Sequence, residues 1–248
     1  MDRESGTLIV IPTYNEAENL EPLVSEIQAL PLPFDLLIVD DNSPDGTGKI
    51  ADRLAGELPN VHVMHREGKL GLGTAYIAGF RWALERDYAC VMEMDCDFSH
   101  HPRYLPNFMH QIENADLVIG SRYVPGGDTP DWGLYRRVMS TGGNLFARFM
   151  LGLKTHDCTG GYRCYRRATI EQVPWDEIGL QGYGFQIGAV YHIERMGGCV
   201  AEFPIVFEDR QLGHSKMSSD IVIEAMKFVT RLALRGGRLR TGRLGGGR

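Results

Sequence analysis

The chain has 248 residues, of which 43% are hydrophobic and 23% charged, and this is the composition of an ordinary globular protein with a buried core. The formal net charge of −6 argues against a general nucleic-acid-binding protein, because such proteins carry a basic excess over one face. The five cysteines form no C-x-x-C pair, so we expect reduced thiols in a cytoplasmic protein. The polar start does not resemble a signal peptide, and no apolar run is long enough to span a bilayer.

Short apolar runs alternate with amphipathic stretches in the first half of the chain. Five runs predict strands, over Thr7–Pro12, Asp35–Val39, Val61–Met64, Tyr88–Met94 and Ala115–Gly120. Three stretches between them predict helices, over Ala17–Leu30, Lys49–Leu58 and Gly71–Arg86. Strands that alternate with helices predict an α/β fold with a Rossmann-like, mostly parallel sheet flanked by helices.

The second half of the chain is less regular. Three helices are predicted, over Tyr135–Leu151, Phe185–Met196 and Ser219–Arg235. Cys199–Phe207 reads as a strand, and Gly160–Arg167 fits either a strand or a hairpin. No linker divides the chain, so we predict one domain over residues 1–235 and a disordered, basic Gly/Arg-rich tail over 236–248.

Two carboxylates follow the fourth predicted strand. In an extended segment Asp95 and Asp97 share one face, because side chains two residues apart point the same way. Open α/β sheets bind ligands beyond the carboxyl ends of their strands, where a pair of carboxylates suits a divalent ion that also takes diphosphate oxygens. D-x-D is also a short pattern that is common by chance. Its position directly after a predicted strand is what favours a metal site here.

The loops after the first two predicted strands reach the same edge of the sheet. There Tyr14 is placed to stack on a base, and a carboxylate to accept hydrogen bonds from a base edge or a ribose hydroxyl. The alternative is turn chemistry, since Asn42–Gly46 is a strong turn by itself. The Gly-rich loop Lys69–Gly73 lacks both known phosphate-loop spacings, and we interpret it as a loop of close approach.

Nine short segments between Leu8 and about Ser219 follow one another in a characteristic order: IPTYNEAENL, IVDDNSPDGTG, GLGTAY, MDCDFSHHP, GSRYVPGG, WGLYRR, DCTGGYRCYRR, GYGFQI and FEDRQLGHSKMS. Together they resemble the family-2 glycosyltransferases of the GT-A fold, and more narrowly the dolichol-phosphate (polyprenol-phosphate) mannose synthases. The resemblance implies inverting, Mg²⁺- or Mn²⁺-dependent transfer of mannose from GDP-mannose to polyprenyl or dolichyl phosphate. The alternatives are transfer of glucose from UDP-glucose and another family-2 reaction.

The same resemblance implies particular site residues. For the donor nucleotide-sugar these are Pro12, Tyr14, Glu16, Asp41, Asp95, Asp97, Arg210 and Lys216. Ser99 falls where the family can supply a third ligand beside the metal-binding Asp95 and Asp97, and the implied acceptor phosphate site comprises Arg122, Arg136 and Arg210. The implied catalytic set is Asp95, Asp97, Arg122 and Arg136.

Two positions depart from the family pattern. Gly188 stands where many members carry an acidic residue after the FQI motif, and His214 stands where many carry Glu. We expect both departures to change the shape of the acceptor site rather than the reaction.

The basic residues also support a phosphate site on physical grounds. Arg122 directly follows the fifth predicted strand, and an arginine fork matches phosphate oxygens in pairs. For Arg137, Arg166 and Arg167 a solvated surface role is the simpler interpretation. Asp157 fits equally an orienting role and a turn.

The chemistry of the acceptor predicts how the reaction proceeds. A phosphate monoester is already mostly anionic at neutral pH and needs no general base, which fits the lack of an obvious catalytic histidine. His100 and His101 precede Pro102 and are interpreted as a helix entry, with metal ligation by either as the alternative. We predict direct in-line attack on the anomeric carbon, with inversion.

The C-terminal helix and tail predict contact with a membrane. The charged residues Glu224, Lys227, Arg231 and Arg235 fall on one side of the predicted helix, and a basic tail follows. The segment therefore suits the anionic surface on the cytoplasmic face of a membrane. The alternative is an ordinary helix packed on the core by its apolar side. A separate membrane-anchoring subunit is a further possible partner.

Two other classes of function are weighed against the transferase. A nucleotidyltransferase would carry a Gly-rich, basic first loop, whereas this loop is acidic and polar. A non-catalytic lipid- or nucleotide-binding subunit would be expected to lack one of the two carboxylates, and both are present.

Overall fold

The structure, a computed structural model, describes residues 6–178, 182–208 and 224–234. Its strands are β1 Gly6–Thr13, β2 Phe34–Asp40, β3 Val61–His65, β4 Tyr88–Glu93, β5 Leu117–Ser121, β6 Arg163–Arg166 and β7 Val200–Pro204. Its α-helices are α1 Leu20–Gln28, α2 Thr47–Glu57, α3 Leu72–Leu84, α4 Leu105–Gln111, α5 Leu134–Leu151, α6 Arg167–Gln172 and α7 Gly182–Arg195. Residues 224–234 are helical as well.

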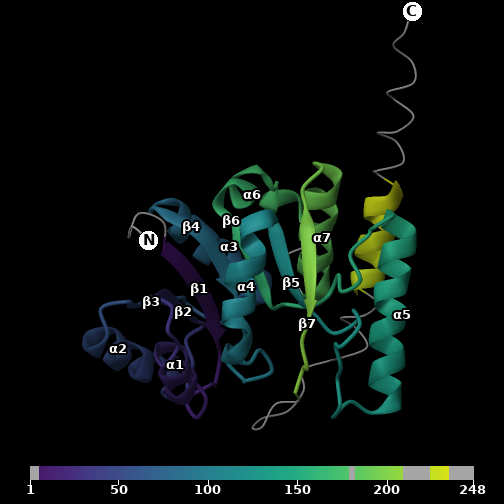
Figure 1. Cartoon of the computed structure of the whole chain (residues 1–248). Coiled ribbons are helices and arrows are strands. Elements are labelled where there is room, and N and C mark those ends of the chain that lie inside the picture. Colours follow the sequence, from purple (N-terminus) through teal and green to yellow (C-terminus); the bar gives the residue numbers. More distant parts are fainter. Residues whose placement is uncertain (1–5, 179–181, 209–223, 235–248) are drawn as a thin grey trace, which may run out of the picture.

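One seven-stranded sheet carries the fold, in the order β3-β2-β1-β4-β6-β5-β7 (Figure 1). All neighbouring strands run parallel except β6, which lies antiparallel between β4 and β5. The predicted mixed, mostly parallel sheet is therefore confirmed, and Gly160–Arg167 contains a strand rather than a hairpin. Because β6 runs against its neighbours, the chain before it reaches the carboxyl edge of β4 and β5.

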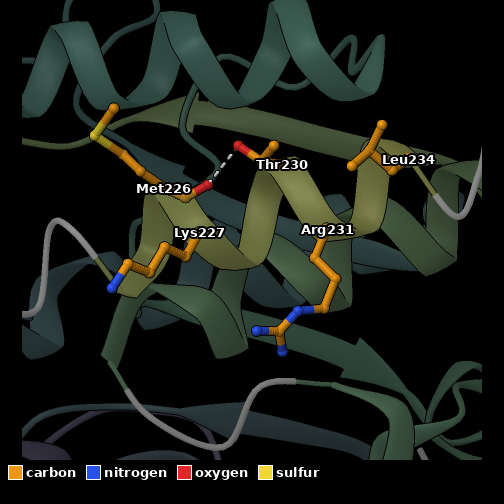
Figure 2. A pocket seen from close by; sticks show the side chains of 5 residues that line it. All are labelled: Met226, Lys227, Thr230, Arg231 and Leu234. Carbon is orange, nitrogen blue, oxygen red and sulfur yellow. Dashed lines mark hydrogen bonds between the residues drawn. The ribbon is translucent and has the colours of Figure 1, made fainter.

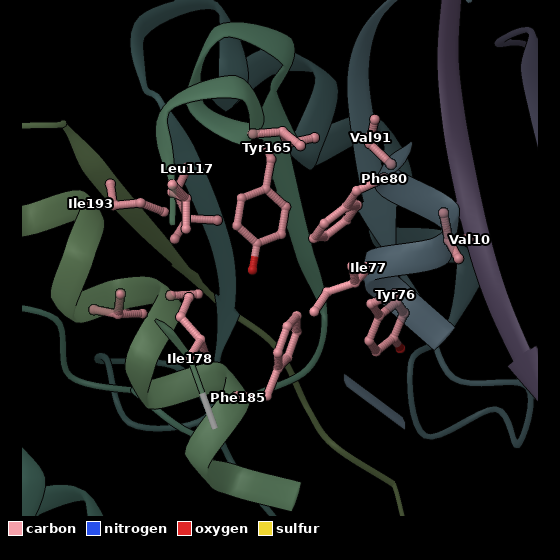
Figure 3. Packing of buried hydrophobic residues seen from close by; sticks show 14 of the residues in the cluster. Val10, Tyr76, Ile77, Phe80, Val91, Leu117, Tyr165, Ile178, Phe185 and Ile193 are labelled. Carbon is pink, nitrogen blue, oxygen red and sulfur yellow. The ribbon is translucent and has the colours of Figure 1, made fainter. Parts of the chain in front are cut away.

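The sheet is buried on both faces, as expected for strands covered by crossover helices. Leu8 and Val10 of β1 pack into one hydrophobic cluster, and Ile9 and Ile11 pack into the other. Figure 3 shows the first cluster, in which aromatic rings from α3, β6 and α7 meet the strands. Phe80 lies at its centre, 5.3 Å from the ring of Tyr165.

The helices form a layer on each face. Buried residues of α1, α2 and α4 belong to the cluster that contains Ile9, whereas those of α3, α5, α6 and α7 belong to the cluster that contains Val10. α3 lies so close to β1 that a Cβ at Gly79 would meet Val10 at 2.6 Å. The two-layer arrangement leaves the carboxyl edge of the parallel strands to the connecting loops.

The sequence-based boundaries hold to within a few residues, with three informative differences. α1 begins at Leu20 rather than Ala17, which places Pro22 in the first turn, where proline is tolerated. The strand predicted to end at Phe207 ends at Pro204. The short helices α4 and α6 were not predicted, because six or seven residues are too few to show a helical period.

Residues 224–234 pack against α7, and this packing leaves little room for a side chain at Gly188. A Cβ at Gly188 would lie 2.7 Å from a methyl group of Ile178 and 3.3 Å from the ring of Phe228. Val229 is buried in the core, so the apolar side of this helix does pack inward, as the simpler interpretation expected. Lys227 and Arg231 remain exposed (Figure 2). Among the described residues, no helix is long and apolar enough to cross a membrane.

Candidate active site

The candidate site lies at the carboxyl edge of the parallel strands, where β1, β2, β4 and β5 all end (Figure 1). The loops that leave these strands carry most of the residues predicted from the sequence. Pro12 is still within β1, opposite Val39, but it lies past the last residue that pairs with β4. Its missing N–H therefore leaves no gap in the ladder, as expected for proline in a strand.

The D-x-D segment turns sharply after β4. The strand ends at Glu93, and Phe98 adopts a positive φ of 62°, which is unusual for a bulky residue and marks a strained turn. The turn brings Ser99 back onto Asp97, whose Oδ1 accepts hydrogen bonds from both the N–H and the hydroxyl of Ser99. Asp97 and Ser99 are both buried. Asp95 and Asp97 therefore lie beyond the end of β4, in a hydrogen-bonded turn rather than in the strand itself.

Asp95 is more exposed than Asp97, and two residues position it. Its Oδ1 accepts a hydrogen bond from the Tyr76 hydroxyl at 3.2 Å, and its N–H donates to Nδ1 of His100 at 2.9 Å. His100 is buried and stacks on Tyr162 with ring centroids 4.8 Å apart. Burial lowers the pKa of His100, so the ring is neutral at pH 7 and its Nδ1 is a hydrogen-bond acceptor. The helix-entry role expected of the histidine pair belongs to His101, which caps Pro102–Tyr104.

A buried polar group lies directly behind this turn. Glu93, fully buried at the end of β4, accepts a hydrogen bond from the Gln186 amide of α7 at 2.6 Å. Burial raises the pKa of Glu93 to about 7, although the nearby Arg163 partly opposes the shift. The Arg163 guanidinium in turn donates to the backbone carbonyl of Gln186 at 2.9 Å. This network ties the strand that carries the D-x-D turn to α7.

The loop after β1 is held by the loop after β2. The N–H of Glu16 donates to the Thr47 hydroxyl at 2.9 Å, and Asp45 accepts from the N–H of Ala17 at 3.1 Å. Tyr14 lies beside the Gly-rich loop, with the Lys69 ammonium 4.6 Å from its ring centroid. The two loops that the sequence assigned to the donor are therefore one connected structure.

Asp41 is paired with an arginine that the sequence did not single out. Arg66, just after β3, forms a salt bridge with Asp41, and each side chain is 9% exposed. The same guanidinium donates to the Thr74 hydroxyl at 2.7 Å and to the Gly71 carbonyl at 3.3 Å. Gly71 has a φ of 99°, and α3 starts immediately after it. Arg66 therefore connects the β2 loop to the Gly-rich loop. Its position at the end of a predicted strand is the one feature of the sequence that could have marked it as a site residue.

Arg122 forms a two-pronged salt bridge with Asp157. Its Nε and Nη2 donate to the two carboxylate oxygens at 2.7 Å each, and the side chains are 6% and 0% exposed. Burial alone raises the pKa of Asp157, but the charge of Arg122 and the donated hydrogen bonds outweigh it and hold this pKa below its usual value. Asp157 also closes a local turn, because its Oδ1 accepts a hydrogen bond from the N–H of Gly160 at 2.8 Å. The turn role considered for Asp157 is therefore present, together with an orienting contact to Arg122.

The loop that carries Asp157 is fastened by carboxylates from two other elements. Glu202 of β7 accepts from the N–H groups of His156 and Asp157 at 2.7 and 2.8 Å. Glu194 of α7 accepts from the N–H and hydroxyl of Thr155 at 2.9 and 2.6 Å. Asn144 of α5 accepts from the N–H of Cys158 at 2.8 Å. These contacts hold the loop that carries Asp157 independently of the Arg122 salt bridge.

Arg122 and Arg136 lie near one another through a shared ring. The guanidinium of Arg136, in the first turn of α5, lies 4.0 Å from the ring centroid of Trp132, and that of Arg122 lies 5.4 Å from the same ring. Tyr123 donates to the Ser140 hydroxyl at 2.7 Å, which joins the loop after β5 to α5. The structure therefore brings the two predicted arginines together.

The remaining predicted residues fall in two groups. Arg210 and Lys216, together with His214 and the tail 236–248, lie outside the described residues. Arg166 and Arg167 have structural roles, since both guanidinium groups donate to backbone carbonyls. Within the described part of the chain, no three His, Cys, Asp or Glu side chains are grouped to hold a metal ion.

Comparisons with known proteins identify the family of the chain. The family model "Glycosyl transferase family 2" matches residues 8–173. An undecaprenyl-phosphate mannosyltransferase of Micrococcus luteus is 50% identical over 92% of this chain and 93% of its own length. A polyprenol monophosphomannose synthase of Mycolicibacterium smegmatis is 47% identical over 93% of this chain and 88% of its own length.

Solved structures share the fold. Mannosyl-3-phosphoglycerate synthase of Rubrobacter xylanophilus has a TM-score of 0.69 at 20% identity and covers 94% of this chain and 76% of its own. A mannosyltransferase of Pyrobaculum calidifontis, solved with GDP-mannose and Mn²⁺, has a TM-score of 0.54 at 16% identity and covers 98% of this chain and 76% of its own. The GT-A fold implied by the motifs is therefore confirmed. The chain belongs to glycosyltransferase family 2, among the relatives of the polyprenol-phosphate mannose synthases.

Proposed function

We propose that this protein transfers mannose from GDP-mannose to a polyprenyl or dolichyl phosphate, with inversion at the anomeric carbon and with Mg²⁺ or Mn²⁺ as cofactor. The observation that carries the proposal is the identity of about half of all residues, over nearly the whole chain, with two proteins named for mannosyl transfer to polyprenyl phosphates. The order of motifs along the sequence and the assembly of their loops at one sheet edge support it.

The carboxylates fit a hard divalent ion. Asp95, Asp97 and the Ser99 hydroxyl present only oxygen atoms, and two carboxylates that leave room for diphosphate oxygens are typical of Mg²⁺ sites in transferases. The metal would neutralise charge on the departing nucleotide diphosphate. Tyr76 and His100 would hold Asp95 in place for it. Mn²⁺ in several structures of the same fold is consistent with this assignment.

The donor nucleotide would bind over the joined loops after β1 and β2. Tyr14 would stack on the base, and Glu16 and Asp41 would accept hydrogen bonds from the base or the ribose. The salt bridge with Arg66 fixes the direction of the Asp41 carboxylate, so its position does not depend on ligand binding. Pro12 would shape the exit from β1.

The cations would act on the phosphates. Arg122, held in one plane by Asp157, and Arg136, which shares Trp132 with it, would bind the acceptor phosphate. Arg210 and Lys216 would complete the phosphate site. Without fixed cations, an anionic acceptor and a diphosphate would repel one another.

The acceptor phosphate would itself be the nucleophile. Its oxygen would attack the anomeric carbon as the bond to the GDP β-phosphate oxygen breaks, so the configuration inverts and no proton needs to be moved. Catalysis would then rest on positioning and on stabilisation of the leaving diphosphate. Because the acceptor is a lipid, the protein would work on the cytoplasmic face of a membrane, as a peripheral protein or with a separate anchoring subunit.

A transfer assay tests the proposal. Purified protein, Mg²⁺ and a short polyprenyl phosphate in detergent are incubated with labelled GDP-mannose or, in parallel, with labelled UDP-glucose. Label that enters the organic phase from GDP-mannose alone supports the proposal. Label from UDP-glucose alone would show that the donor is UDP-glucose rather than GDP-mannose. The absence of transfer from either donor, with Mg²⁺ or Mn²⁺ present, would overturn the proposed reaction.

A further inference from the structure

Trp132, in the loop between β5 and α5, carries a buried hydrogen-bond donor that the rest of the site does not explain. The side chain is 5% exposed, and its Nε1 is buried without a hydrogen-bond partner among the described residues. An indole N–H can only donate, so no change of protonation turns it into an acceptor. A buried donor without an acceptor costs folding free energy, and the few that occur in native structures call for a specific reason.

A second tryptophan shows how such a donor is satisfied in the core. Trp175 donates its N–H to the backbone carbonyl of Ile170 at 2.8 Å. Its ring packs on Phe80, with the centroids 4.8 Å apart, inside one of the two hydrophobic clusters. The protein therefore pairs a tryptophan N–H where the ring serves only packing. The unpaired N–H of Trp132 indicates a different role.

The groups around Trp132 complement an anion. The guanidinium of Arg136 lies 4.0 Å from the centroid of its ring, and that of Arg122 lies 5.4 Å from it. Attraction between a cation and the face of a ring accounts for these contacts, but not for the buried N–H. Two guanidinium groups and one neutral donor in the same place suit a ligand with several anionic oxygens, and a phosphate is such a ligand. Asp157 pairs with Arg122 and holds that guanidinium in place.

The loop that carries Trp132 is held from two sides. The carbonyl of Asp128 accepts from the N–H of Phe207 at 2.9 Å, and the Phe207 ring meets the Trp132 ring edge to face, with the centroids 5.6 Å apart. Arg137, at the start of α5, donates to the Thr129 carbonyl at 2.6 Å. The indole is therefore positioned without any ligand, and a fixed donor loses little conformational entropy when a ligand binds.

Phe207 also connects Trp132 to the D-x-D turn. On its other side the Phe207 ring lies 5.8 Å from the ring of His100. Nδ1 of His100 accepts from the N–H of Asp95 at 2.9 Å. One aromatic ring thus separates the Trp132 site from the residues that position a proposed metal ligand, so a group bound at Trp132 lies beside the proposed reaction centre.

We propose that the Trp132 N–H donates a hydrogen bond to one oxygen of the acceptor phosphate while Arg122 and Arg136 bind the same group. This inference rests on the proposed function, because it takes the acceptor phosphate as the ligand. The bond would restrict rotation of the phosphate and so select the oxygen that faces the anomeric carbon. A neutral donor suits this task, because it withdraws less charge from the nucleophile than a third cation would.

Kinetics of Trp132→Phe test the bond, since phenylalanine keeps an aromatic ring for the arginines but lacks the N–H. The KM for a short polyprenyl phosphate in detergent should rise about tenfold or more, because a hydrogen bond to a charged group is lost. The KM for GDP-mannose should stay within about twofold of wild type. An unchanged KM for the acceptor, or a rise in the KM for GDP-mannose instead, would overturn the inference.

The matched control is Trp175→Phe, which removes a paired N–H far from the phosphates. It should lower the melting temperature, because the Ile170 carbonyl loses its donor, and should leave both KM values at the wild-type level. A rise in the acceptor KM as large as that of Trp132→Phe would show that loosened packing causes both effects, and would overturn the inference.

A spectrum of the indole N–H groups tests the contact without turnover. The chain has three tryptophans, so ¹⁵N-labelled protein gives three indole signals, and the one missing from Trp132→Phe belongs to Trp132. Adding the short polyprenyl phosphate should move this signal downfield, whereas the same polyprenol without phosphate should not. If wild type transfers mannose to this acceptor but the signal does not move, the inference fails and the proposed function stands. If wild type neither transfers mannose nor responds to the acceptor, both fail.

Discussion

Replacing Asp157 with asparagine probes the pair that orients Arg122. Asp157→Asn keeps the shape of the side chain but removes the charge, and leaves the Arg122 guanidinium in a site where the two side chains are 6% and 0% exposed. Removing one partner of a buried ion pair costs about 3–5 kcal/mol, and the amide oxygen keeps part of the hydrogen bonding, so we expect about 3 kcal/mol. In a chain of this size that lowers the melting temperature by roughly 6–12 °C.

Urea denaturation of the purified variant measures this cost. The control is Asp176→Asn, which removes the exposed pair of Asp176 with Arg81, with side chains 92% and 68% exposed, and should cost less than about 0.5 kcal/mol. Adding Arg122→Met to Asp157→Asn should recover part of the loss, because it removes the stranded charge. A decrease in the free energy of unfolding of less than about 1 kcal/mol in Asp157→Asn alone would refute a tightly coupled buried pair.

The same pair predicts how stability depends on pH. Because the folded state holds the pKa of Asp157 below its ordinary value, the ionised carboxylate is favoured by folding. The stabilisation should be fully present above the unfolded pKa of about 3.9 and should be lost as the pH falls through the lower, folded pKa. The stability difference between wild type and Asp157→Asn should therefore shrink in acid. A difference that grew in acid would contradict the sign of the shift.

Three other substitutions test the rest of the site. Arg66→Gln leaves Asp41 without its charged partner and should raise the KM for GDP-mannose by about tenfold or more, with a smaller change in kcat. A KM and kcat equal to those of wild type would count against the proposed donor site. Gly188→Asp should destabilise the fold by about 2 kcal/mol in urea, because its side chain would meet Ile178, and neutral stability would contradict the packing. Asp95→Ala should lower transfer at least about a hundredfold and weaken Mn²⁺ binding in calorimetry, and full turnover with metal would remove the metal site.

Much of the fold was accessible from the sequence because the parallel strands are buried on both faces. Runs such as Leu36–Val39 are apolar throughout, and the turn-rich segments between them fix their ends. β6 was ambiguous because its four residues pair on both sides with strands far away in the chain, at Cys90–Glu93 and Leu117–Ile119. α4 was hidden by its length and by its early proline.

The site could be predicted from the sequence only in part, because many of its contacts join distant segments of the chain. Asp95, Asp97 and Tyr14 are next to the ends of strands, and the sheet itself brings such residues together. The partners that hold them come from elsewhere in the chain: Tyr76 supports Asp95, and Asp157 lies 35 residues beyond Arg122. Such pairs depend on tertiary packing, and a single sequence contains no periodic signal for them.

The configuration of the product tests the central claim most directly. Purified protein is incubated with GDP-α-mannose, Mg²⁺ and a short polyprenyl phosphate, and the anomeric configuration of the isolated product is read by NMR. Direct attack by the acceptor phosphate predicts a β-mannosyl phosphate linked to the lipid. An α-linked product would contradict single-step inversion, and the absence of any mannosylated lipid from correctly folded protein would contradict the proposed reaction itself.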